Sequence, residues 1–165
     1  MNQPRIGGMP LAQRAWSRSS AGFSGRCHAS NQTKHAVVIV DHGSKRRAAN
    51  DALDDVVRLY KTVRDDCYVT KAHMELASPS ILDAVRECKD VAGVDTVIVA
   101  PYFLSNGRHV QEDIPTLVAA AEAEVGVRCV IAGHLGLDDG LVRVLMDRVD
   151  AAADSLSALT NENDK

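Results

Sequence analysis

The sequence AVVIVDHGS, residues 36–44, decides the fold class. Its first five residues are apolar and mostly β-branched, which is typical of a strand that helices cover on both faces. The turn Asp41-His42-Gly43-Ser44 follows directly, and residues 46–64 then place apolar side chains at helical spacing. A buried strand that leads into an amphipathic helix is the unit from which parallel sheets are built.

The same pattern of strand and helix continues along the chain. Three more strands are expected, at residues 68–76, 96–100 and 128–132. Three more helices are expected, at residues 79–89, 114–124 and 139–156. Ser78 and Asp113 are the expected N-caps of the first two of these helices, and residues 101–112 form a long loop. We therefore predict a doubly wound α/β fold around a four-stranded parallel sheet.

The first 34 residues differ in composition from the rest of the chain. They hold five basic residues and a cluster of serines, and no acidic residue precedes Asp41. This composition is typical of an organellar transit peptide, and a disordered extension is the alternative. We predict a transit peptide at residues 1–34, one folded domain at 35–159 and a polar tail at 160–165.

The remainder of the chain is acidic. Residues 35–165 hold 14 basic and 22 acidic side chains, a formal charge near −8, which argues against a nucleic-acid partner. No apolar stretch approaches the roughly 18 to 20 residues of a membrane span. Cys67, Cys88 and Cys129 lie far apart without a Cys-x-x-Cys pair, so we expect buried thiols and no disulfide framework or zinc knuckle.

Residues that can bind a metal or move a proton follow each predicted strand: His42, Glu75, His109 and His134. Ligands of open parallel sheets bind at this edge, outside the carboxyl ends of the strands. Two imidazoles and a carboxylate suit a divalent first-row metal and leave coordination positions open. Imidazole also titrates near neutral pH. His42, Glu75 and His109 are the candidate catalytic and metal-binding residues, while the roles of His73 and His134 stay open.

Basic residues stand beside both candidate histidines. Lys45, Arg46 and Arg47 begin a helix, where cations oppose the helix dipole, and Arg108 precedes His109. Together with the free N–H groups of the helix start and with Ser44, they form a docking place for anionic groups. We predict a polycarboxylate or phosphate ligand.

Four segments carry a family resemblance: VVIVDHGSKRRAAND (37–51), HMELASPSILDAV (73–85), VIVAPYFLSNGRHVQEDIP (97–115) and HLGLDDGLVRVL (134–145). In combination they resemble the small sirohydrochlorin chelatases, single-half class II chelatases that insert iron or cobalt into a tetrapyrrole without ATP. The resemblance implies a chelatase-like half domain in which His42 and His109 bind the metal and Glu75 supplies a carboxylate. Sirohydrochlorin carries eight carboxylates, which would account for the cations.

The resemblance also implies partners and a location. The expected reaction is insertion of Fe²⁺ into sirohydrochlorin to give siroheme, by a two-fold homodimer in the plastid stroma, with the mitochondrion as the alternative. We expect no cofactor beyond the substrate metal, and no iron–sulfur cluster, because no cysteine follows Cys129. His134 replaces a proline that is usual in the family.

Other functions stay open beside this one. The same donors accept Co²⁺ or Ni²⁺, so a cobalt or nickel chelatase is an alternative. A non-catalytic metal carrier is another, although a carrier needs neither the long loop nor the cations. A histidine phosphatase would place an arginine where Asp41 stands, and this carboxylate would repel phosphate.

Overall fold

The strand β1 (His35–Asp41) lies at the centre of the structure. The computed structural model describes residues 34–162, with side chains up to residue 156. The sheet has the strand order β2-β1-β3-β4, and all of its pairings are parallel. The other strands are β2 (Tyr68–His73), β3 (Thr96–Pro101) and β4 (Arg128–Ile131). The four-stranded parallel sheet is confirmed.

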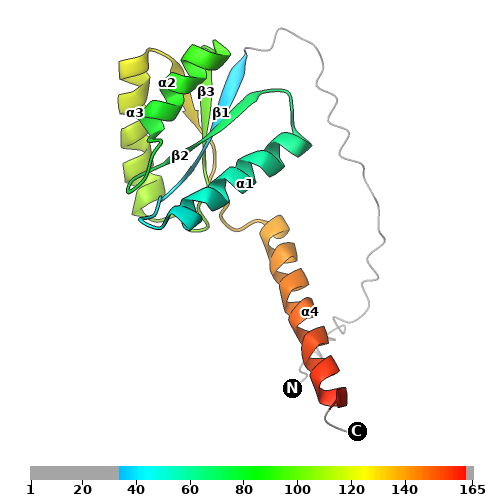
Figure 1. Ribbon diagram of the computed structural model, residues 1–165. Coiled ribbons are helices and arrows are strands. Elements are labelled where there is room, and N and C mark those ends of the chain that lie inside the picture. Colours follow the sequence, from blue (N-terminus) through cyan, green and yellow to red (C-terminus); the bar gives the residue numbers. More distant parts are fainter. Residues whose placement is uncertain (1–33, 163–165) are drawn as a thin grey trace, which may run out of the picture. The chain divides into compact units, whose positions relative to one another are not determined.

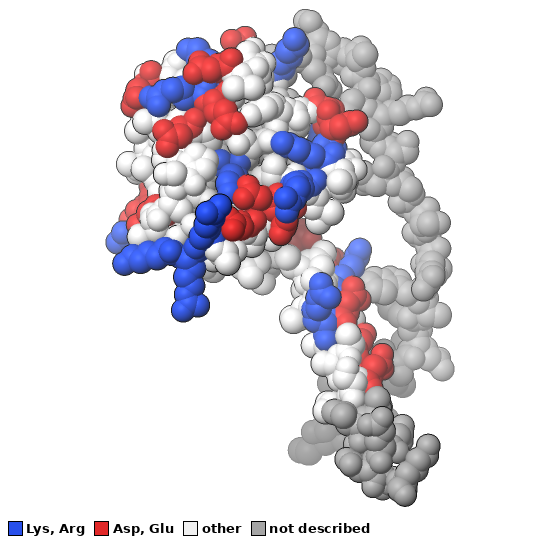
Figure 2. Space-filling view, viewed as in Figure 1, with Lys and Arg blue, Asp and Glu red and all other residues white. Residues whose placement is uncertain are grey.

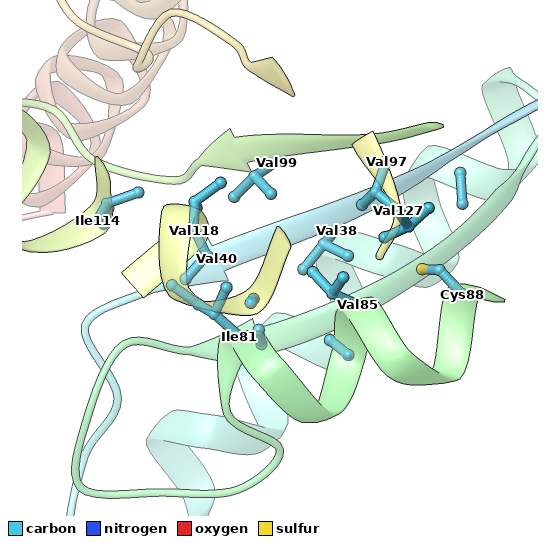
Figure 3. Close-up of a cluster of buried hydrophobic side chains, with 14 of the residues drawn as sticks. Val38, Val40, Ile81, Val85, Cys88, Val97, Val99, Ile114, Val118 and Val127 are labelled. Carbon is cyan, nitrogen blue, oxygen red and sulfur yellow. The ribbon is translucent and has the colours of Figure 1, made fainter. Parts of the chain in front are cut away.

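Helices cover both faces of the sheet because alternate residues of β1 point to opposite faces. On one face Val37 and Ile39 pack with Leu53 and Val57 of α1 (Arg47–Val63). On the other face Val38 and Val40 pack with side chains of α2 (Ile81–Ala92) and α3 (Ile114–Val125), as Figure 3 shows. Figure 1 shows α2 and α3 side by side, with α1 across the sheet from them. This arrangement is doubly wound, as predicted.

The strand order explains which helix covers which face. The chain moves from β1 to β2 in one direction and then returns past β1 to β3 and β4 in the other. Crossovers between parallel strands are right-handed, so reversing the direction moves the following helices to the opposite face. A topological switch point therefore lies between the carboxyl ends of β1 and β3.

The predicted end of β2 and the predicted start of α2 are wrong. β2 ends at His73, so Glu75 lies two residues beyond the strand and does not end it. α2 begins at Ile81 and is capped by Ser80, whose hydroxyl and N–H pair reciprocally with Asp83 in a capping box. Ser78 and Pro79 belong to the preceding turn and not to the helix.

The predicted loop at 101–112 is shorter than expected. A π-helical turn, η1 (His109–Asp113), leads directly into α3, so His109 stands at a helix start and not within a loop. Asp113 occupies the N-cap position of α3 as predicted, yet its side chain caps no N–H of the helix.

The last helix, α4 (Asp139–Glu162), extends beyond the predicted end at residue 156. Its apolar side chains are at least half exposed at the following positions: Val142, Val144, Leu145, Met146 and Val149. No helix in the described part of the chain combines the length and hydropathy that a membrane crossing requires.

The expectation of buried thiols is met at Cys88, which is fully buried, whereas Cys67 and Cys129 are half-buried. All three are free cysteines. Burial raises the pKa of the Cys88 thiol to about 12 and that of Cys129 to about 11, so both stay protonated at neutral pH. The predicted transit peptide, residues 1–34, lies outside the described residues except for Lys34.

Candidate functional site

The candidate site lies at the switch point of the sheet. His42 directly follows β1, and His109 stands at the end of the segment that follows β3. β1 and β3 are neighbours whose following helices pass to opposite faces, and at such a switch point open α/β sheets bind their ligands. Strand order alone therefore brings together two histidines that are 67 positions apart in the sequence.

Three of the predicted residues come together at this edge of the sheet. Nε2 of His42 lies 3.0 Å from Oε1 of Glu75. The rings of His42 and His109 stand edge to face, with centroids 4.9 Å apart and an interplanar angle of 74°. The three side chains are 41%, 52% and 42% exposed, so the site is open to a large ligand.

Gly43 allows Glu75 to come this close to His42. The parallel hydrogen bonding of β1 and β2 continues past the strand ends, through Met74 N–H to Asp41 O (2.8 Å) and Glu75 N–H to His42 O (3.1 Å). Gly43 has φ +83°, and a Cβ there would lie 1.9 Å from the carbonyl oxygen of Glu75. Only glycine fits this turn.

Asp113 fixes the orientation of His109. Nδ1 of His109 lies 2.7 Å from Oδ2 of Asp113, which also lies 3.5 Å from Nε of Arg108. The hydrogen bond with His109 and the charge of Arg108 lower the pKa of the Asp113 carboxyl below its usual value. A carboxylate on Nδ1 leaves Nε2 of His109 available as a metal ligand.

The electrostatics at His42 favour a cation between its ring and Glu75. Nδ1 of His42 lies 3.1 Å from the carbonyl oxygen of Gly43, which favours the tautomer with a proton on Nδ1. Nε2 then turns a lone pair toward the Glu75 carboxylate, and two such groups at 3.0 Å repel each other unless a proton or metal ion lies between them. A divalent metal suits this pair of donors.

The three donors do not form a closed cage. Within residues 34–162, no group of three His, Cys, Asp or Glu side chains already has the arrangement of a metal site. His42 and Glu75 form the closely spaced pair, and the His109 ring stands beside them.

Three of the four predicted cations, Lys45, Arg46 and Arg47, lie at the start of α1, and Ser44 is hydrogen-bonded in the turn that precedes it. Arg46 is the N-cap residue and Arg47 the first residue of the helix, where Arg47 lies 3.9 Å from Asp51. The Ser44 hydroxyl accepts a hydrogen bond from Arg46 N–H at 3.0 Å. In the described part of the chain, Lys45 and Arg46 have no acidic partner in an ion pair. Figure 2 shows basic side chains projecting from the α/β part of the molecule near the start of α1.

Sequence reasoning missed two supports of the site. Asn50 accepts from Ser44 N–H and donates to Ser44 O, both at 2.8 Å, and so ties the turn after His42 to the first turns of α1. Asp41 binds the fully buried His73, with Oδ1 2.5 Å from Nδ1. No local pattern marks Asp41 and His73 as partners, since they meet only through the register of β1 and β2.

His134, the fourth residue predicted at a strand end, lines a different part of the described structure from these three residues. It lines a hollow of about 780 Å³ between residues 104–106, which follow β3, and residues 133–138, which follow β4. Gly136 has φ +56°, and a Cβ there would lie 3.1 Å from Nε2 of His134. His134 therefore forms part of the wall of this hollow.

Fold and site together define a class of protein: an α/β domain with an open histidine and carboxylate site at its switch point. A profile of the CbiX family matches residues 36–152, which is most of the chain. The chain belongs to the CbiX family.

Individual relatives agree with this assignment. The chain is 43% identical over 114 residues to the chloroplastic sirohydrochlorin ferrochelatase of Arabidopsis thaliana, a match that covers 68% of this chain and 50% of that one. It thus spans half the length of that relative. It is 32% identical over 116 residues to the sirohydrochlorin cobaltochelatase of Sulfurisphaera tokodaii, covering 70% of this chain and 92% of that one.

A solved structure confirms the fold. The CbiX protein of Marinobacter aquaeolei, described as a putative cobalamin biosynthesis protein, superposes with a TM-score of 0.65 at 28% identity. The superposition covers 73% of this chain and 98% of that one.

Proposed function

We propose that the protein is a sirohydrochlorin ferrochelatase that inserts Fe²⁺ into sirohydrochlorin without ATP. The observation that carries the proposal is the cluster at the switch point, where Nε2 of His42 lies 3.0 Å from Glu75 and the His109 ring stands 4.9 Å from that of His42. The matched Arabidopsis relative bears the name of this activity.

The donor set suits metal insertion because it can both bind and release an ion. Two imidazole nitrogens and one carboxylate leave coordination positions free for the pyrrole nitrogens of the incoming ring. The four ring nitrogens chelate the ion more strongly than three separate side chains, so transfer to the ring needs no nucleotide. Insertion also displaces two pyrrole protons, which imidazole or carboxylate groups can accept.

The surroundings of the donors suit a flat ring with an acidic rim. Exposed apolar side chains follow three of the strands at this edge: Leu76, Tyr102, Leu104, Leu135 and Leu137. Lys45, Arg46, Arg47 and Arg108 supply positive charge to the same edge. An apolar wall and a basic margin are complementary to a macrocycle that carries carboxylates around its circumference.

The donor types do not discriminate between metals, so cobalt or nickel insertion is the alternative reaction. The cobaltochelatase name of the Sulfurisphaera relative favours the cobalt alternative. The test is anaerobic incubation of the full chain with sirohydrochlorin and Fe²⁺, Co²⁺ or Ni²⁺ in turn, followed by visible absorbance. We expect fastest conversion with Fe²⁺; metal binding without insertion of any ion would support a metal carrier instead.

We further propose that two copies form a homodimer. The half-exposed apolar side chains of α4 and the exposed Val130 and Ile131 of the edge strand β4 are surfaces that a second copy would bury. Light scattering should give about twice the 17.7 kDa mass of one chain, and Leu145→Glu should shift the protein toward the monomer. A monomeric wild type would contradict this part of the proposal.

We place the enzyme in the plastid stroma, with residues 1–34 as its transit peptide, because the Arabidopsis relative is named chloroplastic. No cofactor besides the substrate metal is required for the steps above, and we expect neither an iron–sulfur cluster nor a nucleic-acid or membrane partner.

A further inference from the structure

We propose that the buried pair Asp41–His73 is a positioning device, which holds the turn 41–43 so that the His42 ring faces Glu75. Neither residue belongs to the donor set, since the Asp41 carboxylate binds the His73 ring and the Gly43 N–H. The inference extends the proposed function, because it concerns the metal-binding geometry that this function requires.

The contacts of Asp41 link the strand end to the turn. Its Oδ1 atom lies 2.5 Å from Nδ1 of His73 and also accepts a hydrogen bond from Gly43 N–H at 3.0 Å. Its backbone oxygen accepts Met74 N–H at 2.8 Å. Asp41, the residue before His42, is therefore tied both to Gly43, the residue after His42, and to the end of the neighbouring strand.

His73 is held so firmly that it can act as an anchor. It is 0% exposed and is the one buried polar residue of the described core. Its N–H donates to Pro79 O at 2.8 Å, and its backbone is in register with Asp41 on the neighbouring strand. The ring can therefore move little, and the Asp41 carboxylate that binds it is fixed as well.

The chemistry of His73 shows that this position is not used for packing alone. Nε2 of His73 is buried and has no hydrogen-bond partner among the described residues. An apolar residue of similar size would avoid that unpaired nitrogen, since a buried unsatisfied polar atom is destabilising. The Nδ1 contact with Asp41 is what a histidine supplies here and a leucine does not.

The variants separate positioning from packing. His73→Leu keeps volume but removes the donor, whereas His73→Asn keeps an N–H donor at the position of Nδ1 and should restore the contact. Asp41→Ala removes the other partner of the contact. The Asp41 side chain is 23% exposed, so this variant provides the test if the buried substitution His73→Leu prevents folding. Val85→Ala, at a fully buried position on α2, is the control for a general loss of packing.

Two measurements on the full chain without tetrapyrrole test the proposal: Co²⁺ binding by visible absorbance, and hydrogen exchange of the Gly43 amide in the metal-free protein. We expect His73→Leu and Asp41→Ala to weaken Co²⁺ binding about 10- to 100-fold, as loss of a ligand's support does, and to speed exchange at Gly43. His73→Asn and Val85→Ala should bind Co²⁺ as the wild type does.

Two further outcomes distinguish failure of the positioning role from failure of the proposed function. If His73→Leu binds Co²⁺ like the wild type and leaves exchange at Gly43 unchanged, the positioning role is overturned while insertion activity can stand. If the wild type binds Co²⁺ with the expected dependence on His73 but inserts no metal, the positioning role is supported and the proposed function is wrong.

Discussion

Nδ1 of His109 lies 2.7 Å from Oδ2 of Asp113, four residues further along the same helical segment. A carboxylate on one ring nitrogen orients the imidazole and directs the other nitrogen toward a metal. A contact within one helical turn therefore orients His109, one of the proposed metal ligands.

Replacing Asp113 by Ala should lower metal-insertion turnover about 10- to 100-fold, because loss of such a supporting carboxylate typically has this effect. Asp113→Asn keeps an acceptor oxygen and should fall between Ala and the wild type. Turnover is measured by the absorbance change of the tetrapyrrole. Glu112→Gln, at the exposed neighbouring position, is the matched control, and an equal loss in that variant would contradict the specific role of Asp113.

Gly43→Ala should destabilise the fold by more than about 2 kcal/mol, because a left-handed backbone alone costs an L-residue roughly 1–2 kcal/mol. The new Cβ would also lie 1.9 Å from the carbonyl oxygen of Glu75. Urea unfolding measures the change. Gly107→Ala is the control, since a Cβ there meets no atom within 4 Å, and it should change stability by less than about 0.5 kcal/mol.

The double substitution Lys45→Ala, Arg46→Ala should raise KM for the tetrapyrrole and leave kcat nearly unchanged. Each exposed ion pair contributes roughly 0.2–1 kcal/mol, so the expected increase in KM is about 2- to 30-fold, and it should shrink at high salt. Arg128→Gln, at the first residue of β4 and hence at the opposite end of the sheet, is the control. A fall in kcat with unchanged KM would contradict a substrate-binding role.

The contact between Tyr68 and Glu87 predicts that the folded protein loses stability at high pH. Its hydroxyl binds the Glu87 carboxylate, and this hydrogen bond, with burial, raises the pKa of Tyr68 to about 12. Because the folded pKa lies above the ordinary value of 10.0, the stabilisation is complete below pH 10 and is lost as pH rises toward 12. Titration by phenolate absorbance should show a late step that Tyr68→Phe abolishes and Tyr102→Phe retains.

The fold could be predicted because buried parallel strands leave a plain pattern in the sequence. Residues 36–40 are apolar at every position, and the structure covers them on both faces. The convergence of His42 and His109 could also be predicted, because the carboxyl ends of parallel strands share one edge.

What could not be predicted depends on contacts between elements or on competition between local signals. The Asp41–His73 pair depends on the register of β1 and β2, which no local pattern gives. The start of α2 was misplaced because Ser78-Pro79 and Ser80 with Asp83 are both start signals, and the capping box forms at the second. Asp113 was expected to cap α3, but its carboxylate binds His109.

In the proposed function, His42 and His109 together hold a divalent ion and deliver it to a tetrapyrrole. The most direct test is the rate of Fe²⁺ insertion into sirohydrochlorin by the full-length wild type, His42→Ala and His109→Ala, with circular dichroism and thermal unfolding as controls for folding. We predict that each substitution lowers turnover by more than about 10²-fold, the lower end of what a positioned acid or base contributes, while the fold stays intact. Wild-type rates in both folded variants would contradict the claim.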